Sequence, residues 1–390
     1  MKIVFMGTPE YAVLPLKQLL VNHEVVAVCT QPDRPAGRGH KMHMSPVKAT
    51  ALSAGVQVLQ PEVLKISRIR GQKTSTERGG YEPTKEAFTG HEEVSAEDGK
   101  VSAKYDKILT KNTIAKEARE HLASLDADVF VVAAYGLILP KAVLDMPRFG
   151  CINIHASLLP KYRGASPINA VIANGETTTG ITIMHMDVGI DTGDIILQHG
   201  LSIGPDERVQ SLHDRMSALG AKCILEALVL MEKGIATRTP QDDAKASYAP
   251  MIKKSDGLIN WAWPTSRIIN LTRAYDPWPG SYTLYKGDAV KIWRVEECET
   301  VTLDTSIAGP SEKNTSENKT EALKAALPKT GPPRAAPGTV LAVDLTKGLV
   351  VKTSDSAAWI TEMQAAGGKR MHAVDYLRGR EIKVGEVLGR

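Results

Sequence analysis

Cysteine is scarce in this sequence, and the few that occur are not paired by spacing. Cys29, Cys151, Cys223 and Cys298 are spread over 390 residues without a Cys-x-x-Cys motif. This scatter argues against a disulfide framework or a zinc site, and it is typical of proteins from a reducing compartment. We therefore expect a cytoplasmic protein.

Long hydrophobic runs are also missing. No run approaches the roughly 20 apolar residues that a membrane span needs. The opening MKIVFMGTP has the pattern of a strand and a turn, not that of a signal peptide. We expect a chain that is neither exported nor embedded in a membrane.

Aromatic residues make up only 5% of the chain, and the net charge is only +4. The mild charge permits a nucleic-acid partner without requiring one. Four of the five tryptophans fall between Trp261 and Trp293, and we expect them to fill a core, not to stack on bases. The length and the 43% of hydrophobic residues indicate two domains.

The N-terminal half alternates continuous apolar runs with helical stretches. The runs cover residues 2–6, 25–30, 128–134 and 151–155. Such runs are typical of parallel strands buried on both faces, so the predicted fold class is α/β with a doubly wound, mostly parallel sheet. Thr8 as N-cap, with Pro9 in the first helical position, predicts a helix to about Leu20.

The C-terminal third has short, alternating strand-like segments bounded by glycine turns, as in a small β-barrel. These segments cover residues 280–285, 289–295, 339–344 and 348–353, after one helix near 264–274. An amphipathic helix at 207–233 closes the first part. We therefore expect domains at 1–234 and 253–390, with a linker at 235–252.

Two polar, turn-rich stretches interrupt this organisation. Residues 68–104 and 301–336 have few apolar anchors. Because neither buries enough surface to offset its ordering entropy, we interpret both as surface insertions.

The densest polar chemistry follows Cys151. Asn153 and His155 are two residues apart on a predicted strand, so their side chains emerge on one face. The strand ends at His155, and ligands of parallel sheets bind beyond the C-terminal ends of strands. An isolated histidine there is more often structural than catalytic, but the neighbouring amide shifts that balance.

A glycine-containing loop some thirty residues later carries Asp187, Asp191 and Asp194. A calcium loop is the obvious alternative, but Gly189 stands at its third position and Gln198 at its twelfth, where oxygen ligands and glutamate belong. We therefore expect no metal and interpret the loop as presenting a carboxylate to the histidine.

The segment QPDRPAGRGHKMHMSPVK, residues 31–48, is rich in cations and nearly free of acids. Arg34, Arg38, Lys41 and Lys48 lie in it, and its glycines and prolines predict a loop and not a helix. A solvated basic loop is the ordinary interpretation. Contact with a phosphate backbone is the alternative.

Together these segments resemble the folate-dependent formyltransferases, and among them the branch that acts on methionyl-tRNA. The matching pieces are MKIVFMGTPEYA, TQPDRPAGRG, VVAAYGLILPKAVLDMPRFGCINIHASLLPKYRGASPI, TGITIMHMDVGIDTGDII and AYDPWPGSY. The likeness spans nearly the whole chain except 68–104 and 301–336. It implies a Rossmann-like domain, a C-terminal oligonucleotide-binding-like (OB-like) barrel that binds tRNA, and 10-formyltetrahydrofolate as formyl donor.

The resemblance also implies roles for individual residues. The catalytic trio would be Asn153, His155 and Asp191. The folate site would be lined by Ser157, Leu158, Leu159 and Pro160. The acceptor stem of initiator methionyl-tRNA would be bound by Arg34, Arg38 and Lys41, and the protein would act as a monomer.

Formyl transfer to an amine is compatible with this set. A free α-amino group titrates near ~8, so no strong base is needed. Asn153 could donate to the oxyanion, and His155 could donate to it or move protons between the nitrogens. Asp191 would favour the charged imidazolium.

Three alternatives differ from this interpretation. A formyltransferase for a small amine, such as glycinamide ribonucleotide or an amino sugar, would need neither the basic loop nor the barrel. An inactive RNA-binding protein would not need the intact trio. A nicotinamide dehydrogenase would need a glycine fingerprint, of which only Gly7 is present.

Overall fold

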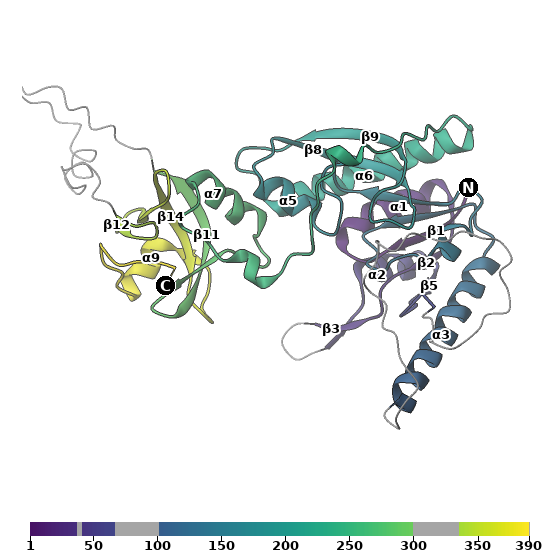
Figure 1. Ribbon diagram of the computed structural model, residues 1–390, viewed down its shortest axis with the longest axis horizontal. Coiled ribbons are helices and arrows are strands. Elements are labelled where there is room, and N and C mark those ends of the chain that lie inside the picture. Colours follow the sequence, from purple (N-terminus) through teal and green to yellow (C-terminus); the bar gives the residue numbers. More distant parts are fainter. Residues whose placement is uncertain (37–40, 67–100, 299–334, 390) are drawn as a thin grey trace, which may run out of the picture. The chain divides into compact units, whose positions relative to one another are not determined.

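The computed structural model describes residues 1–36, 41–66, 101–298 and 335–389 (Figure 1). The chain forms two compact units. The first contains Met1–His155, Ile181–His199 and Ser217–Asp242; the second contains Ala156–Gly180, Gly200–Met216 and Asp243–Arg390. Because each unit is assembled from several stretches, the domain limits at 234 and 253 remain predictions.

A seven-stranded sheet forms the centre of the first unit, in the order β5-β2-β1-β6-β7-β8-β9. Its strands are β1 Lys2–Gly7, β2 Glu24–Cys29, β5 Gln57–Leu59, β6 Val129–Ala133, β7 Cys151–His155, β8 Thr178–His185 and β9 Ile195–Ser202. The first five in this order pair in parallel, whereas β8 is antiparallel to β7. The four strands predicted for this half are confirmed.

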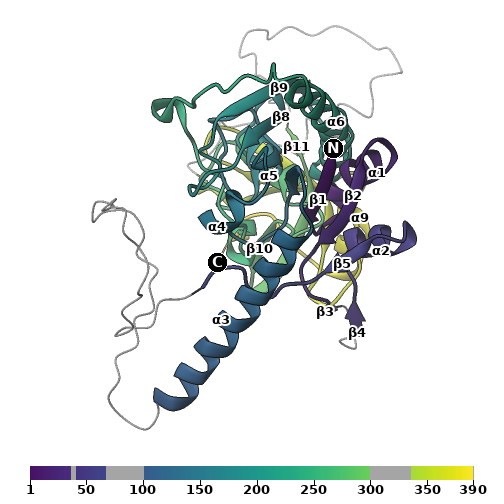
Figure 2. The same cartoon turned by 90° about the vertical axis from the view of Figure 1, so that its right-hand side faces the viewer.

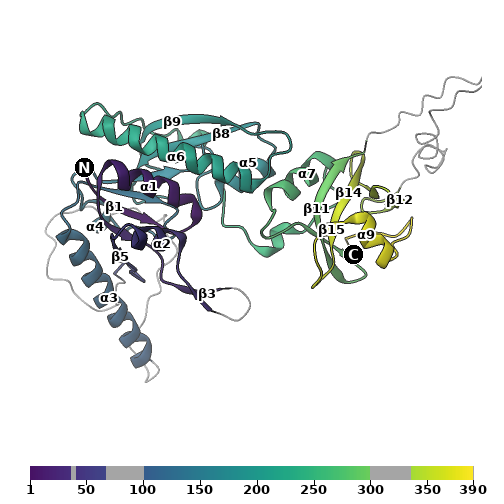
Figure 3. The same ribbon diagram turned by 180° about the vertical axis from the view of Figure 1, so that it is seen from behind.

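Helices cover both faces of this sheet (Figures 1 and 3). On one face, Ile154 of β7 lies against Gly220 of α6, Val209–Glu232. On the other, the Cys151 thiol reaches backbone oxygens of α4, Lys141–Leu144, and Leu122 of α3, Val101–Ser124, joins the same apolar cluster. The doubly wound α/β prediction is confirmed.

The first helix does not begin as predicted. The Thr8 hydroxyl donates to the carbonyl of Tyr135 at 3.0 Å and so does not cap a helix. Glu10–Ala12 form a single 3₁₀ turn, η1, and α1 is Val13–Asn22. A long-range partner has displaced the local capping bond, and Thr8 ties the end of β1 to the loop after β6.

The basic segment 31–48 is also more regular than a loop. β3, Arg34–Ala36, pairs antiparallel with β4, Lys41–His43, and Figure 2 shows this hairpin extending away from the sheet. Helix α2, Pro46–Ser53, then begins with the Ser45 hydroxyl accepting the Lys48 amide at 3.0 Å. The prediction that this segment contains no helix was wrong. Pro46 stands at the first position of α2, where its missing N–H costs nothing.

The predicted insertions lie mostly outside the described residues, which omit 67–100 and 299–334. Helix α3 begins at Val101, within the last residues of the first predicted insertion. The stretch 235–252 contains the short 3₁₀ helix η2, Asp243–Lys245, and two isolated β-bridges. A second such helix, η3, is Lys254–Gly257.

The second unit carries an antiparallel sheet in the order β10-β11-β14-β13-β12, with β15 paired to β14. The strands are β10 Tyr282–Tyr285, β11 Asp288–Glu297, β12 Val340–Asp344, β13 Gly348–Lys352, β14 Ala357–Gln364 and β15 Met371–His372. The helices are α5 Pro167–Ala173, α7 Thr265–Ala274 and α9 Ala373–Gly379. The antiparallel C-terminal architecture and α7 are confirmed, while β14 and α9 were missed.

The tryptophans only partly follow their prediction. Trp261 and Trp293 are buried, and Trp263 packs against the core of the sheet. Trp278, in contrast, leaves 53% of its surface exposed. The prediction that the tryptophan-rich segment fills the core is therefore wrong for Trp278.

Candidate active site

The end of strand β7 presents the two polar side chains that the period of two predicted. Asn153 and His155 point to the same side as Cys151, the face on which α4 lies. His155 is only 5% exposed, whereas Asn153 is half-buried. The His155 imidazole is therefore largely shielded from solvent.

Asp191 reaches this place on the tightly folded loop between β8 and β9. Its φ of 55° lies in the left-handed region. The Gln241 amide donates to the carbonyls of Asp191 and Gly193, both at 2.8 Å. A side chain at Gly193 would overlap the His185 carbonyl, so the chain can pass here only with glycine. The backbone of the loop and the Gln241 side chain therefore fix its conformation together.

The other carboxylates of this loop have different partners. Asp187 accepts the Thr192 hydroxyl at 2.6 Å and the Gly189 amide at 3.0 Å, and so closes the turn. Asp194 lies 4.0 Å from Arg238. Of the three aspartates, Asp191 is the one whose carboxylate faces the amide and the imidazole.

Asn153, His155 and Asp191 are thus brought together. The Asn153 amide donates to one Asp191 carboxylate oxygen at 3.4 Å, and His155 Nδ1 lies 3.7 Å from the other. The Asn153 contact is a long hydrogen bond, and the separation of His155 from the carboxylate is beyond hydrogen-bond range. The cluster can offer an amide N–H and an imidazole N–H to a reacting oxygen, with a carboxylate behind them.

The predicted folate loop, residues 157–160, belongs to the second unit and is firmly anchored. Ser157 is fully buried and donates to the Lys161 carbonyl at 2.6 Å. Leu159 is buried too, whereas Leu158 and Pro160 are half-buried. Ser157 therefore supports the turn, and Leu158 and Pro160 are the residues with apolar surface left for a ligand.

The next residues pair with a stretch that was predicted to be a mere linker. The Arg163 guanidinium is 2% exposed and donates to Asp243 at 2.8 Å. Its backbone exchanges hydrogen bonds with Ser247 and Ala249. A Cβ at Gly164 would stand 2.7 Å from the Ala249 carbonyl. Sequence reasoning missed this support, because nothing in the composition of 235–252 marks it.

A cavity of about 440 Å³ lies in the first unit where β1, β2 and β6 end. Its polar lining consists of Thr8, Gln31, Arg34, His43, Ser45 and Tyr135. Arg34 donates to the Gln31 side chain at 3.1 Å, which holds the guanidinium at the wall. Arg34 is thus one predicted RNA-binding residue that lines a cavity.

The remaining cations of segment 31–48 are placed differently. Lys48 binds Asp33 at 2.6 Å and Gln60 at 2.8 Å, so it fastens the base of the hairpin. The hydrogen bond from Lys48 lowers the pKa of Asp33 below its usual value. Lys41 lies in β4, and Arg38 lies outside the described residues.

The C-terminal cations are largely paired within the second unit. Arg370 binds Asp276 and Glu362, Arg378 binds Asp375, and Lys383 lies 3.4 Å from Glu381. Within the described ranges, no group of three or more His, Cys, Asp or Glu could hold a metal ion, and no helix there is long and apolar enough to cross a membrane.

The first unit is a doubly wound sheet with an amide, an imidazole and a carboxylate at the end of one strand. The family to which such a chain belongs follows from its similarity to known proteins. Residues 1–228 match the model of the formyl transferase family, and residues 251–381 match that of the formyl transferase C-terminal domain. The chain therefore belongs to the formyl transferase family, and the prediction of a formyltransferase is confirmed.

The relatives within this family are more specific. Methionyl-tRNA formyltransferase of Geobacter metallireducens is 40% identical over 390 residues, covering 100% of this chain and 99% of its own. That of Caldanaerobacter subterraneus is 39% identical over 389 residues, covering 100% of both chains.

Solved structures agree on the fold. The sugar 3N-formyl transferase WlaRD, crystallised with dTDP and 5-N-formyl-THF, is 17% identical with a TM-score of 0.51, covering 92% of this chain and 96% of that one. An N-formyltransferase of Helicobacter canadensis in complex with folinic acid and dTDP-3-aminofucose is 16% identical with the same TM-score, covering 92% of this chain and 98% of that one.

Proposed function

We propose that this protein transfers the formyl group of 10-formyltetrahydrofolate to the α-amino group of methionine on initiator methionyl-tRNA. The observation that carries the proposal is the cluster of Asn153, His155 and Asp191 at the end of β7. Full-length relatives at 38–40% identity that bear the name methionyl-tRNA formyltransferase favour this acceptor over a small amine.

In the proposed reaction, the uncharged amine attacks the formyl carbon and a bond to nitrogen forms. The carbonyl oxygen becomes an oxyanion, which the Asn153 amide and the His155 N–H stabilise by donating hydrogen bonds. The carbon–nitrogen bond to the folate then breaks, and its nitrogen takes up the proton that the amine releases. Asp191 holds the imidazole and stabilises its charged form.

The donor binds against the loop of residues 157–160. Leu158 and Pro160 offer apolar surface to a flat ring, and the buried Ser157 keeps the turn rigid. In the sequence, this loop begins two residues after His155.

The acceptor end occupies the 440 Å³ cavity at the ends of β1, β2 and β6. β6 pairs with β7, so this cavity opens on the same edge of the sheet as His155. Arg34 at its wall supplies a charge for phosphate. Lys41 of β4 extends this contact along the acceptor stem, as does Arg38, which lies outside the described residues. The domain formed by 253–390 also binds the tRNA. The enzyme acts as a cytoplasmic monomer.

The test uses labelled formyl-folate with initiator or elongator methionyl-tRNA. Label should appear on the initiator alone, and Asn153→Ala or His155→Ala should reduce the rate by orders of magnitude. His199→Ala is the matched control, because His199 also pairs with a carboxylate, Glu226 at 2.8 Å, but lies exposed. Full activity of the Asn153 variant, or label on a small amine and not on tRNA, would contradict the proposal.

A further inference from the structure

Trp278 is a tryptophan that is not buried in a core. Trp261, Trp293 and Trp359 are at most 7% exposed, whereas Trp278 is 53% exposed. The side chain follows the exposed Pro277 and precedes the buried Pro279 and Gly280. An indole ring left in water costs free energy, and this position does not contribute it to a core.

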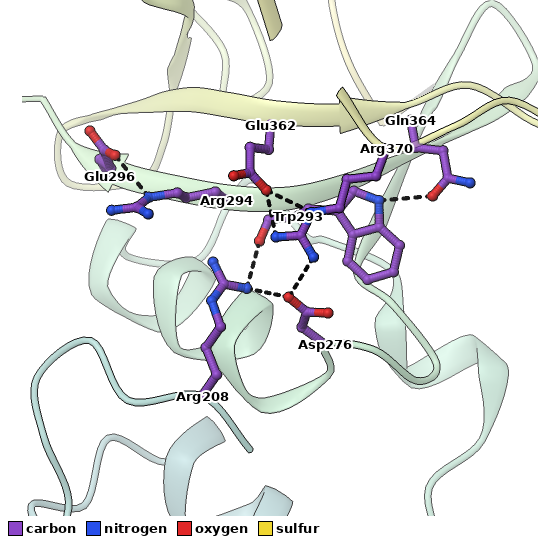
Figure 4. A network of polar contacts seen from close by, with 8 residues as sticks. All are labelled: Arg208, Asp276, Trp293, Arg294, Glu296, Glu362, Gln364 and Arg370. Atoms are coloured by element: carbon purple, nitrogen blue, oxygen red, sulfur yellow. Dashed lines mark hydrogen bonds and ion pairs between the residues drawn. The ribbon is translucent and has the colours of Figure 1, made fainter. Parts of the chain in front are cut away.

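The loop that carries Trp278 is fastened on both sides by cations. Before it, the Asp276 carboxylate accepts hydrogen bonds from Arg208 at 2.5 Å and Arg370 at 2.9 Å. After it, Lys291 donates to the Pro279 carbonyl at 3.3 Å. Figure 4 shows Arg208 and Arg370 converging on Asp276. The ring is therefore displayed on a loop that is fixed at both ends.

Two of these cations, Lys291 and Arg370, also contact a second tryptophan, Trp293. Lys291 lies 4.9 Å and Arg370 5.1 Å from the Trp293 ring, and the Trp293 indole donates to Gln364 at 2.9 Å. Cation–π contacts and the fixed indole restrict both side chains. Lys291 remains partly exposed, and Arg370 is 41% exposed.

We propose that Trp278 stacks on an unpaired nucleobase of the bound RNA, while Lys291 faces an adjoining phosphate. An aromatic face beside cations is the arrangement by which proteins hold single-stranded nucleotides. Arg208, Lys291 and Arg370 contact the loop or its neighbours, and the two arginines are paired with Asp276 and Glu362, so the positive groups outnumber the negative ones by one. The charge therefore favours an anionic partner over a second protein surface. The inference rests on the proposed function only in taking the partner to be RNA.

The experiment compares Trp278→Ala and Trp278→Phe in the full chain. Leu345→Ala is the matched control, because Leu345 is 60% exposed in the same unit and lies in the turn between β12 and β13. Binding of initiator methionyl-tRNA and of a short single-stranded RNA is measured, together with the KM for formyl-folate. We expect Trp278→Ala to weaken RNA binding on the order of 10-fold, Trp278→Phe to retain most of it, and the folate KM to stay constant.

Fluorescence gives a second measurement. RNA should quench the emission of the wild-type protein, and Trp278→Phe should lose most of that quenching. Unchanged RNA affinity in Trp278→Ala would overturn the inference, as would a self-associating wild type that Trp278→Ala turns into monomers. A wild-type protein that binds RNA but does not formylate tRNA would refute the proposed function without contradicting the stacking role of Trp278.

Discussion

Replacing Gly220 by alanine tests how closely helix α6 supports the catalytic strand. Gly220 lies in α6, and the Cβ of an alanine there would stand 2.9 Å from Cγ2 of Ile154. Ile154 is the residue of β7 between Asn153 and His155, and it is 2% exposed. The substitution therefore presses on the strand that carries the proposed catalytic side chains.

Two opposite effects set the size of the change. Alanine in place of glycine favours the helix by roughly 0.5–1 kcal/mol. Crowding a well-packed core costs roughly 1–3 kcal/mol, and here the contact is at least 0.5 Å shorter than the 3.4 Å at which ordinary contact begins. Crowding wins, so the free energy of unfolding should fall by about 1 kcal/mol. Catalytic groups must be held within about 0.5 Å of their productive geometry. The activation free energy of turnover should therefore change more than the free energy of unfolding does.

The assay is denaturant unfolding, followed by initial rates at saturating donor and tRNA. Gly379→Ala is the matched control, since Gly379 ends helix α9 and nothing lies within 4 Å of the added Cβ. The control should leave stability unchanged or slightly raised, and activity unchanged. If Gly220→Ala proves as stable and as active as the wild type, α6 does not bear on β7 as argued.

Other predictions address single groups. Asn153→Ala should lower kcat by about 10²–10³-fold if the amide is an oxyanion donor, with the unfolding midpoint unchanged; a loss confined to KM would contradict that role. Lys48→Met should raise the KM for tRNA but not for folate, because Lys48 fastens the base of the hairpin to Asp33. The acid unfolding of this variant should also change, because the Lys48 hydrogen bond lowers the pKa of Asp33 in the folded state. In the wild type the pair stabilises the fold above the pKa that Asp33 has in the unfolded chain. This stabilisation is lost as the pH falls through the pKa of the folded state. Burial, aided by Arg238, lowers the pKa of His185 to about 4, so stability should decline as pH falls from about 6.5 to about 4. His185→Asn should flatten that slope in thermal unfolding, and a slope equal to that of the wild type would contradict the prediction.

The sequence predicted what depends on local pattern. The strands of the first unit were found because runs such as 128–134 are apolar without interruption, which only strands buried on both faces tolerate. The shared face of Asn153 and His155 follows from the period of two. The hairpin at 34–43 was missed because its short strands are defined by pairing with each other and not by composition.

What escaped prediction depends on partners distant in the chain. Thr8 was predicted to cap a helix, but its hydroxyl donates to the carbonyl of Tyr135, 127 residues away in the sequence. The Asp191 carboxylate was assigned from resemblance, and the Gln241 amide that fixes its loop was not anticipated. Trp278 had the same composition signal as its buried neighbours, and only the fold separates them.

The backbone pairing of Arg163 with Ser247 and Ala249 has a consequence for anyone who shortens this chain. A fragment ending at residue 234 would retain every proposed catalytic side chain yet lose the strand-like partner of residues 161–164, and with it the carboxylate that neutralises a guanidinium enclosed in protein. Such a fragment keeps the catalytic side chains but loses the backbone support of the residues that follow the proposed folate loop. A truncated form of this enzyme should therefore end after residue 249.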